Sequence, residues 1–258
     1  MYSRSAEEPR MSIDAYKDFA ERYDLPFGRF GDHEPQVGEF FRQLIVKNDL
    51  HTVLDCACGT GRHLDIFHSL GCEVTASDVS EAMLAQAKKN LTEQGLEIPV
   101  RQMDFRDLPD YYAMRFDAVV CLSAIGFMPD ETECLRAFKS MFEVLRAGGL
   151  LVLTAMPTDR QWKEKPRFTL VTNTRDFSRL FVIDYNAREA CYTILDIFHS
   201  EERCELKEWS AELRVFLRDD HERMLKAAGF QRVDFYGSFD FTPYDRETST
   251  SLITVAYK

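Results

Sequence analysis

The segment Thr52–His63 constrains the fold of this chain more than any other. Its first four residues, Thr52 to Asp55, include a short apolar run without polar alternation, which is typical of a buried parallel strand. Gly59 and Gly61 follow, and because they lack a Cβ atom the backbone can turn sharply and approach a ligand closely. A helix is predicted directly after them, and its free N–H groups would face a polar or anionic ligand.

Strands and helices are predicted to alternate through the first 155 residues. After the strand at 52–55, further strands are expected at 73–77, 98–103, 116–123 and 150–155, with amphipathic helices between them. This alternation predicts an α/β fold with a doubly wound, mostly parallel sheet of the Rossmann-like kind. Two last strands, at 231–236 and 252–257, would form an antiparallel pair and complete a seven-stranded sheet.

The pattern changes after Pro157, where an antiparallel β insertion is predicted to follow the fifth strand. Runs rich in β-branched and aromatic residues at 179–185, 190–199 and 206–216 are separated by short polar segments, as in hairpins. We expect this insertion to act as a lid over the ligand edge of the sheet. The sequence then divides into an N-terminal helical lid or lead (1–50), a ligand-binding Rossmann-like domain (51–156 and 217–258) and a substrate-covering insertion (157–216).

Three acidic residues, Asp55, Asp78 and Asp104, follow successive predicted strands. Parallel strands end at the same edge of a sheet, so these carboxylates should lie near one ligand. Asp78 follows Gly59 by 19 residues, close to the spacing at which an acid meets a ribose diol in a βαβ unit. The third acid, Asp104, would suit an exocyclic amine. Together these acids predict a site for a ligand shaped like adenosine.

The glycine turn departs from the fingerprint of dinucleotide sites. Ala57 stands where the Gly-x-Gly-x-x-Gly pattern has its first glycine, and Arg62 follows Gly61. Asp55 lies within the turn, where an acid would repel a pyrophosphate but suit a ligand with an ammonium group. A nicotinamide dinucleotide oxidoreductase on a similar sheet therefore remains only as an alternative, as does a non-catalytic nucleoside sensor.

These segments resemble the motifs of the class I S-adenosylmethionine-dependent methyltransferases. The similar stretches, in order, are Val53 to Gly61, Asp78 to Ala87, Asp104-Phe105, Phe116 to Cys121 and Leu145 to Leu151. Within that class the chain is most similar to the glycine/sarcosine N-methyltransferase type. That similarity lies in residues 116–122, Pro129-Asp130, the antiparallel insertion and Phe241-Thr242-Pro243-Tyr244.

The resemblance implies S-adenosyl-L-methionine as the cofactor and suggests which residues bind it. The residues expected to contact the cofactor are Asp55, Cys56, Ala57, Gly59, Gly61, Asp78, Val79, Met83, Asp104, Phe105, Leu122 and Tyr23. Those expected to contact the substrate are Arg160, Arg167, Ser123 and Tyr16. Tyr16 and Tyr23 have helical spacing, so a place in the core is an equal alternative for them.

The implied reaction is an in-line displacement at a sulfonium methyl, in which the enzyme mainly aligns the acceptor. The expected acceptor is a small polar metabolite, with an amine favoured and a carboxylate, hydroxyl or thiol left open. An amine must react in its neutral form, so a proton acceptor would help. The candidates are Tyr244, His199 and His33, although each is more often a structural residue.

Composition restricts the partners. The 258 residues carry a net charge of −11, which argues against nucleic acid because phosphate binding needs clustered Lys and Arg. We expect no membrane span and no signal sequence, because no apolar stretch approaches the roughly 18 residues a span requires. Seven scattered cysteines suggest reduced thiols in a cytoplasmic protein. Their spacing is not that of zinc ligands. A monomer or small homo-oligomer without metal is expected.

Overall fold

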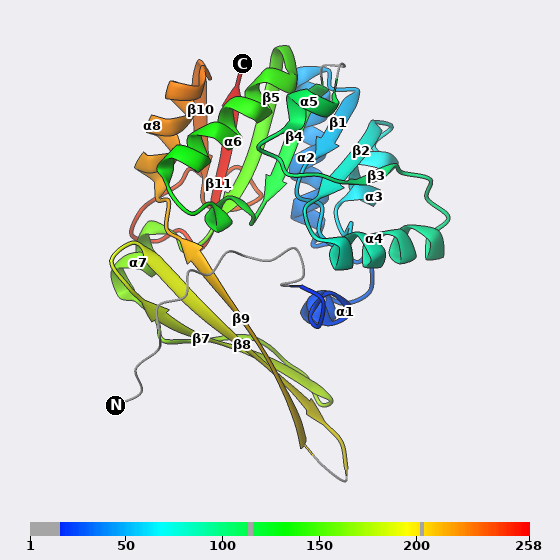
Figure 1. Cartoon of the computed structure of the whole chain (residues 1–258), viewed down its shortest axis with the longest axis vertical. Helices are drawn as coiled ribbons and strands as arrows, with labels where there is room; N and C mark the ends of the chain where they lie inside the picture. The colour runs from blue at the N-terminus through cyan, green and yellow to red at the C-terminus, as the bar shows by residue number, and fades with distance from the viewer. Residues whose placement is uncertain (1–15, 113–115, 202–203) are drawn as a thin grey trace.

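The computed structural model describes residues 16–112, 116–201 and 204–258, and it contains two β-sheets (Figure 1). The larger sheet has seven strands in the order β10-β11-β5-β4-β1-β2-β3. Their bounds are β1 Thr52–Asp55, β2 Glu73–Asp78, β3 Val100–Gln102, β4 Phe116–Leu122, β5 Leu145–Ala155, β10 Arg232–Tyr236 and β11 Leu252–Tyr257. The predicted Rossmann-like sheet is confirmed.

The chain direction explains where a ligand can bind. Strands β1 to β5 pair in parallel, whereas β11 pairs antiparallel with both β5 and β10. From β1 the chain moves to β2 and β3 on one side, and it returns to β4 on the other side of β1. This reversal of strand order opens a crevice at the carboxyl ends of β1 and β4.

Helices cover both faces of the larger sheet and bury its apolar residues. On one face α5, α6 and α8 enclose a core that includes Phe138, Met141 and Leu225, and on the other α2 and α3 contribute Phe41 and Phe67 (Figure 1). The helices are α1 Ala20–Tyr23, α2 Pro35–Asn48, α3 Leu64–Ser69, α4 Glu81–Glu93, α5 Leu108–Tyr111, α6 Glu131–Val144, α7 Asp159–Glu164 and α8 Arg218–Ala228, with single 3₁₀ turns η1 Leu25–Phe27 and η2 Ile125–Phe127. None of these described helices is long and apolar enough to cross a bilayer.

Two predicted elements are shorter than expected. The third strand begins at Val100 rather than at 98, since Pro99 has no N–H to donate to a neighbouring strand and contributes only its carbonyl, to Ala76. The second is the helix expected from the helical spacing of Tyr16 and Tyr23, predicted from Ile13 to Tyr23, of which residues 13–15 lie outside the described residues. The remainder is a turn at 16–19 followed by the single helical turn α1.

The smaller sheet consists of four antiparallel strands between α7 and α8, and it extends away from the larger sheet (Figure 1). Its strands are β6 Phe168–Asn173, β7 Phe177–Tyr185, β8 Glu189–His199 and β9 Cys204–Arg214, in that spatial order. Three of them match the predicted runs, and β6 was not predicted. Ala190, Tyr192 and Ile194 alternate along β8 as the buried face, so this inner face is the one that packs against the rest of the protein.

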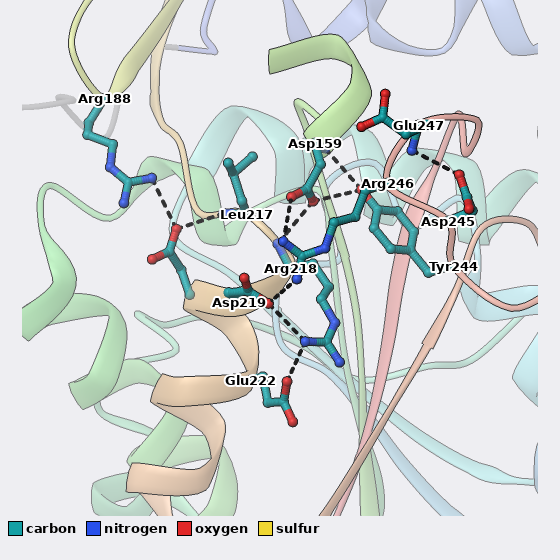
Figure 2. Close-up of polar contacts among 11 residues, drawn as sticks. Asp159, Arg188, Leu217, Arg218, Asp219, Glu222, Tyr244, Asp245, Arg246 and Glu247 are labelled. Atoms are coloured by element: carbon teal, nitrogen blue, oxygen red, sulfur yellow. Dashed lines mark hydrogen bonds and ion pairs between the residues drawn. The ribbon is translucent and has the colours of Figure 1, made fainter. Parts of the chain in front are cut away.

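A polar junction joins the two points at which the chain leaves and re-enters the larger sheet (Figure 2). Asp159 begins α7 and Arg218 begins α8, and the Arg218 amide donates to Asp159 Oδ2 at 3.3 Å. The Tyr244 hydroxyl donates to the same oxygen at 2.8 Å and accepts from the Asp159 amide at 2.9 Å. Nearby, Arg188 of the β7–β8 turn pairs with Asp220 of α8 at 3.2 Å. The smaller sheet is therefore anchored at its base.

This junction predicts a structural effect for Tyr244→Phe. Loss of a hydroxyl that bonds both a carboxylate and an amide should lower the free energy of unfolding by about 1–3 kcal/mol, measured by urea denaturation. Tyr111→Phe, at a residue that is 58% exposed, should leave the stability unchanged. A Tyr244→Phe protein of wild-type stability with no methyl transfer would instead favour the catalytic role suggested by sequence.

Candidate active site

A cavity of about 1030 Å³ lies at the carboxyl edge of the larger sheet and extends to the smaller sheet. Its volume suffices for a nucleoside cofactor together with a small acceptor. Ten of the twelve residues expected to contact the cofactor line it: Cys56, Ala57, Gly59, Asp78, Val79, Met83, Asp104, Phe105, Leu122 and Tyr23. Ser123 and Tyr16, expected near the substrate, line it as well.

The glycine turn and Asp78 are held together by backbone amides. Gly59 has φ of +54° and Gly61 of +80°, values that favour glycine. The Gly59 amide donates to Asp78 Oδ2 at 2.8 Å, and the Ser80 amide donates to Oδ1 at 2.9 Å. Burial raises the pKa of Asp78, although these amides oppose the rise. Each oxygen keeps further lone pairs, so the carboxylate can accept from a ribose diol.

Asp55 lies behind the cavity surface and is 2% exposed. Its Oδ1 accepts from the Ala57 amide at 3.3 Å. Burial raises the pKa of Asp55 to about 7, and the charge of Asp78 acts in the same direction. A bound ligand with an ammonium group nearby would therefore favour ionisation of Asp55.

Arg106, which the sequence analysis missed, occupies part of the region expected for adenine. Its Nε lies 3.0 Å from both carboxylate oxygens of Asp104, and its guanidinium also reaches Glu133. Burial raises the pKa of Asp104, but the hydrogen bonds and charge of Arg106 outweigh it, so the net pKa is below its usual value. Its position two residues after the strand-end acid was the available signal.

Tyr16 and Tyr23 bring two hydroxyls to the cavity from the N-terminal segment. The Tyr16 ring lies 5.0 Å from Trp209 of β9 and 6.1 Å from Phe127 of η2. Burial raises the pKa of both tyrosines, that of Tyr23 to about 12, and the charge of Asp78 acts in the same direction on each. Both hydroxyls are therefore protonated at neutral pH and can donate hydrogen bonds.

Five other predicted residues are outside the cavity lining and have polar partners of their own. None of Tyr244, His33, His199, Arg160 and Arg167 lines the cavity. The Tyr244 hydroxyl binds Asp159 in the junction, and burial raises the pKa of Tyr244 above its usual value. His33 Nε2 lies 2.8 and 2.9 Å from the two oxygens of Asp65, and His199 Nε2 lies 3.0 Å from Ser178 Oγ. Arg160 pairs with Glu164 and Arg167 with Asp184, both at 3.1 Å.

The geometry therefore gives no support to the predicted catalytic roles of Tyr244, His33 and His199. It gives none to the predicted substrate contacts of Arg160 and Arg167 either. Asp55 and Gly61 also lie outside the lining, but in the turn directly beneath it. A Cβ atom at Gly61 would lie 3.3 Å from Leu64 and 3.4 Å from Ala87, so this glycine allows α4 to approach the turn.

The smaller sheet supplies polar cavity residues that the sequence analysis missed. They come in register across β8 and β9 as the pairs Glu189–Arg214, Cys191–Glu212 and Thr193–Ser210, with Asp184 of β7 opposite Cys191. Tyr192, Ala211 and Leu213 also line the cavity from the opposite, inner face of the hairpin. Since β9 is an edge strand, the cavity extends around that edge. Alternating polar residues in both strands were the only local signal.

The fold and site define an α/β protein with a cavity of nucleoside size at the carboxyl edge of its parallel strands. A family model described as a methyltransferase domain matches residues 53–149. A glycine/sarcosine N-methyltransferase of Aphanothece halophytica is 28% identical over 230 residues, covering 86% of this chain and 81% of the relative. A ubiquinone biosynthesis O-methyltransferase of Xanthomonas axonopodis is 34% identical over 104 residues, covering 40% and 42%.

Among solved structures, an S-adenosylmethionine-dependent methyltransferase of Clostridium acetobutylicum shares the fold over 94% of this chain and 98% of its own, with a TM-score of 0.78 at 18% identity. That likeness shows the fold. The domain match and the methyltransferase relatives identify the chain as a class I S-adenosylmethionine-dependent methyltransferase, an enzyme whose cofactor is S-adenosylmethionine.

Asp78→Asn tests the proposed ribose contact. The amide keeps the shape of the side chain but loses the charge that strengthens its hydrogen bonds, so S-adenosylhomocysteine should bind about tenfold to hundredfold more weakly. Calorimetric titration measures this. Asp110→Asn, at an exposed residue of α5, serves as the control. Equal affinity in the two variants would contradict the assignment.

Asp55 predicts a pH dependence of cofactor binding. Its pKa is about 7 in the free protein, and a bound ammonium group would lower it, so binding releases a proton. The affinity for S-adenosylhomocysteine should therefore rise as the pH increases to about 7 and level off above it, where Asp55 is already ionised in the free protein. Asp55→Asn should flatten this rise. Titrations in two buffers of different ionisation enthalpy would detect the released proton, and a flat wild-type profile would exclude the effect.

Proposed function

We propose that this enzyme transfers the methyl group of S-adenosylmethionine to the nitrogen of a small polar amine. The charge of the cavity carries this proposal. Its described lining has five carboxylates, on Asp78, Asp104, Asp184, Glu189 and Glu212, against two guanidinium groups, on Arg106 and Arg214. Such a lining favours cations, and both the sulfonium cofactor and a protonated amine are cations.

Pairing of the two arginines supports an acceptor without a carboxylate of its own. Arg106 is engaged by Asp104 and Glu133, and Arg214 lies 3.5 Å from Glu189. The lining described here therefore offers no cation that lacks an acidic partner. A free amino acid such as glycine would leave its carboxylate without a counter-charge, at considerable cost in a partly dry cavity.

The proton of the amine needs an acceptor before methyl transfer. An ammonium group has no lone pair, so only the neutral amine can attack the methyl carbon. We infer that Glu189 or Glu212, which reach the cavity from the smaller sheet, attract the ammonium form and pass its proton toward solvent. The cofactor supplies the activated methyl group, and the protein aligns the nitrogen with it.

Transfer to oxygen or sulfur is the alternative, and one relative is named an O-methyltransferase. An unactivated hydroxyl has a far higher pKa than an ammonium group and needs a stronger base. No histidine or lysine occurs among the described residues that line the cavity. This composition of the lining favours nitrogen over a hydroxyl as the atom that is methylated. The match to a methyltransferase domain removes the dinucleotide oxidoreductase as an alternative.

We further propose the division of labour expected from the sequence. Residues 51–156 and 217–258 would bind the cofactor, 157–216 would form the wall and lid on the acceptor side, and 1–50 would cover the cofactor. A protein of the cytoplasm without a nucleic-acid partner, as a monomer or small homo-oligomer, fits its net charge of −11 and its described helices.

An acceptor screen tests this function. With methyl-labelled S-adenosylmethionine, label should enter amines that lack a carboxylate in preference to amino acids, phenols, alcohols and thiols. The rate at low acceptor concentration should rise with pH, as the neutral amine becomes more abundant. Label transferred only to a carboxylate, hydroxyl or thiol would refute the proposal.

Glu212→Gln should raise the acceptor KM about tenfold, the value of one charge-assisted contact, while S-adenosylhomocysteine affinity stays constant. Glu208→Gln is the matched control, because Glu208 lies four residues away on the same face of β9 but does not line the cavity. An unchanged KM in Glu212→Gln would remove the smaller sheet from the acceptor site.

A further inference from the structure

A buried charge cluster fastens the N-terminal segment Tyr16–Tyr23 to the smaller sheet. Arg179 of β7 donates from Nη1 to the carbonyl of Tyr23 at 2.9 Å and from Nη2 to the carbonyl of Arg22 at 2.7 Å. Its Nε and Nη2 also donate to the two oxygens of Asp196 on β8, at 2.5 and 2.9 Å. Arg22 pairs with Asp196 as well, and Asp196 is fully buried.

Aromatic contacts dock the same segment on β9. The ring of Phe19 stacks on Trp209 with centroids 4.4 Å apart and planes 6° apart, and Tyr16 lies 5.0 Å from the same indole. The Arg179 guanidinium lies 4.9 Å from the Phe19 ring. Arg179, Asp196 and Trp209 lie on one face of the smaller sheet by register, so this face receives the whole segment.

The segment therefore reaches two parts of the molecule. Tyr16 and Tyr23 line the cavity near Asp78, whereas the carbonyls at the end of α1 are held by the smaller sheet. The single guanidinium group of Arg179 binds both the carbonyls at the end of α1 and the carboxylate of Asp196 on the next strand. Such planar, multidentate geometry fixes orientation in a way that a point charge cannot.

We propose that Arg179 and Asp196 are positioning residues for methyl transfer: they hold Tyr16 and Tyr23 over the cofactor, so the smaller sheet controls how tightly the cofactor is bound. This inference rests on the proposed placement of the cofactor at the ends of β1 and β2. An acceptor that binds the smaller sheet and favours the docked segment then strengthens cofactor binding, and the cofactor strengthens acceptor binding equally.

The test removes both charges at once. Asp196→Leu or Arg179→Met alone would leave a buried charge without its partner, which can unfold a protein. The double variant Arg179→Met/Asp196→Leu avoids most of that cost, since Arg22 is close enough to solvent to turn outward, its side chain being 11% exposed. The matched control, Arg175→Met/Glu201→Leu, removes an exposed pair in the segments that join strands of the same sheet, with charged atoms 3.9 Å apart.

Both double variants are made in a Trp162→Phe background, in which Trp209 is the only tryptophan of the chain. Iodide quenching of Trp209 then reports whether the segment is docked, and calorimetry with S-adenosylhomocysteine reports cofactor affinity. We expect Arg179→Met/Asp196→Leu to fold, to bind S-adenosylhomocysteine at least tenfold more weakly and to show at least twofold stronger quenching. The control should match the parent in both measurements.

Two results would overturn the inference. One is a folded double variant with parental affinity, and the other is weakened binding without any change in the quenching of Trp209. If the double variant does not fold, the same measurements on Arg179→Lys replace it, because lysine keeps the charge but cannot reach the carboxylate and both carbonyls together. Failure of the proposed function is distinguishable, since it would appear as absent amine methylation in a parent protein that still binds S-adenosylhomocysteine.

Discussion

The parallel pairing of β1 with β2 is the constraint on which the rest of the site depends. It places Asp55 opposite Ala76, so the glycine turn that follows β1 lies beside the end of β2. The Gly59 amide then reaches the Asp78 carboxylate, and this bond joins a backbone turn to the side chain that ends the neighbouring strand. A cofactor bound there meets groups whose positions are fixed by the sheet itself and not by flexible loops.

The cofactor half of the site could be predicted because its signals are local. A strand, a glycine turn and an acid at the next strand end are written within residues 52–78, and each has a direct physical meaning. The proposed acceptor half depends on the pairing of Cys191 with Glu212, which are distant in sequence. The residue pattern along each strand predicted that the strand exists, but it could not predict which face of the smaller sheet would line the cavity.

The same distinction explains the predicted residues that lie elsewhere. His33 and Tyr244 are chemically suited to catalysis, but Asp65 and Asp159 bind them, and neither partner is near in sequence. The sequence shows which titratable side chains the protein has, but only the folded structure shows which of them already have a partner. For the same reason Arg214 and Arg106 do not count as anion sites, since acidic side chains satisfy both.

The junction around Asp159 also bears on how such an enzyme can change during evolution. The chain leaves the larger sheet at Asp159 and returns at Arg218, and one carboxylate contacts both points. The strands between these two points pair only with one another, so their length and sequence can vary while the large sheet keeps its register. If this stretch forms the acceptor wall as proposed, that wall can be replaced during evolution while the cofactor site stays intact.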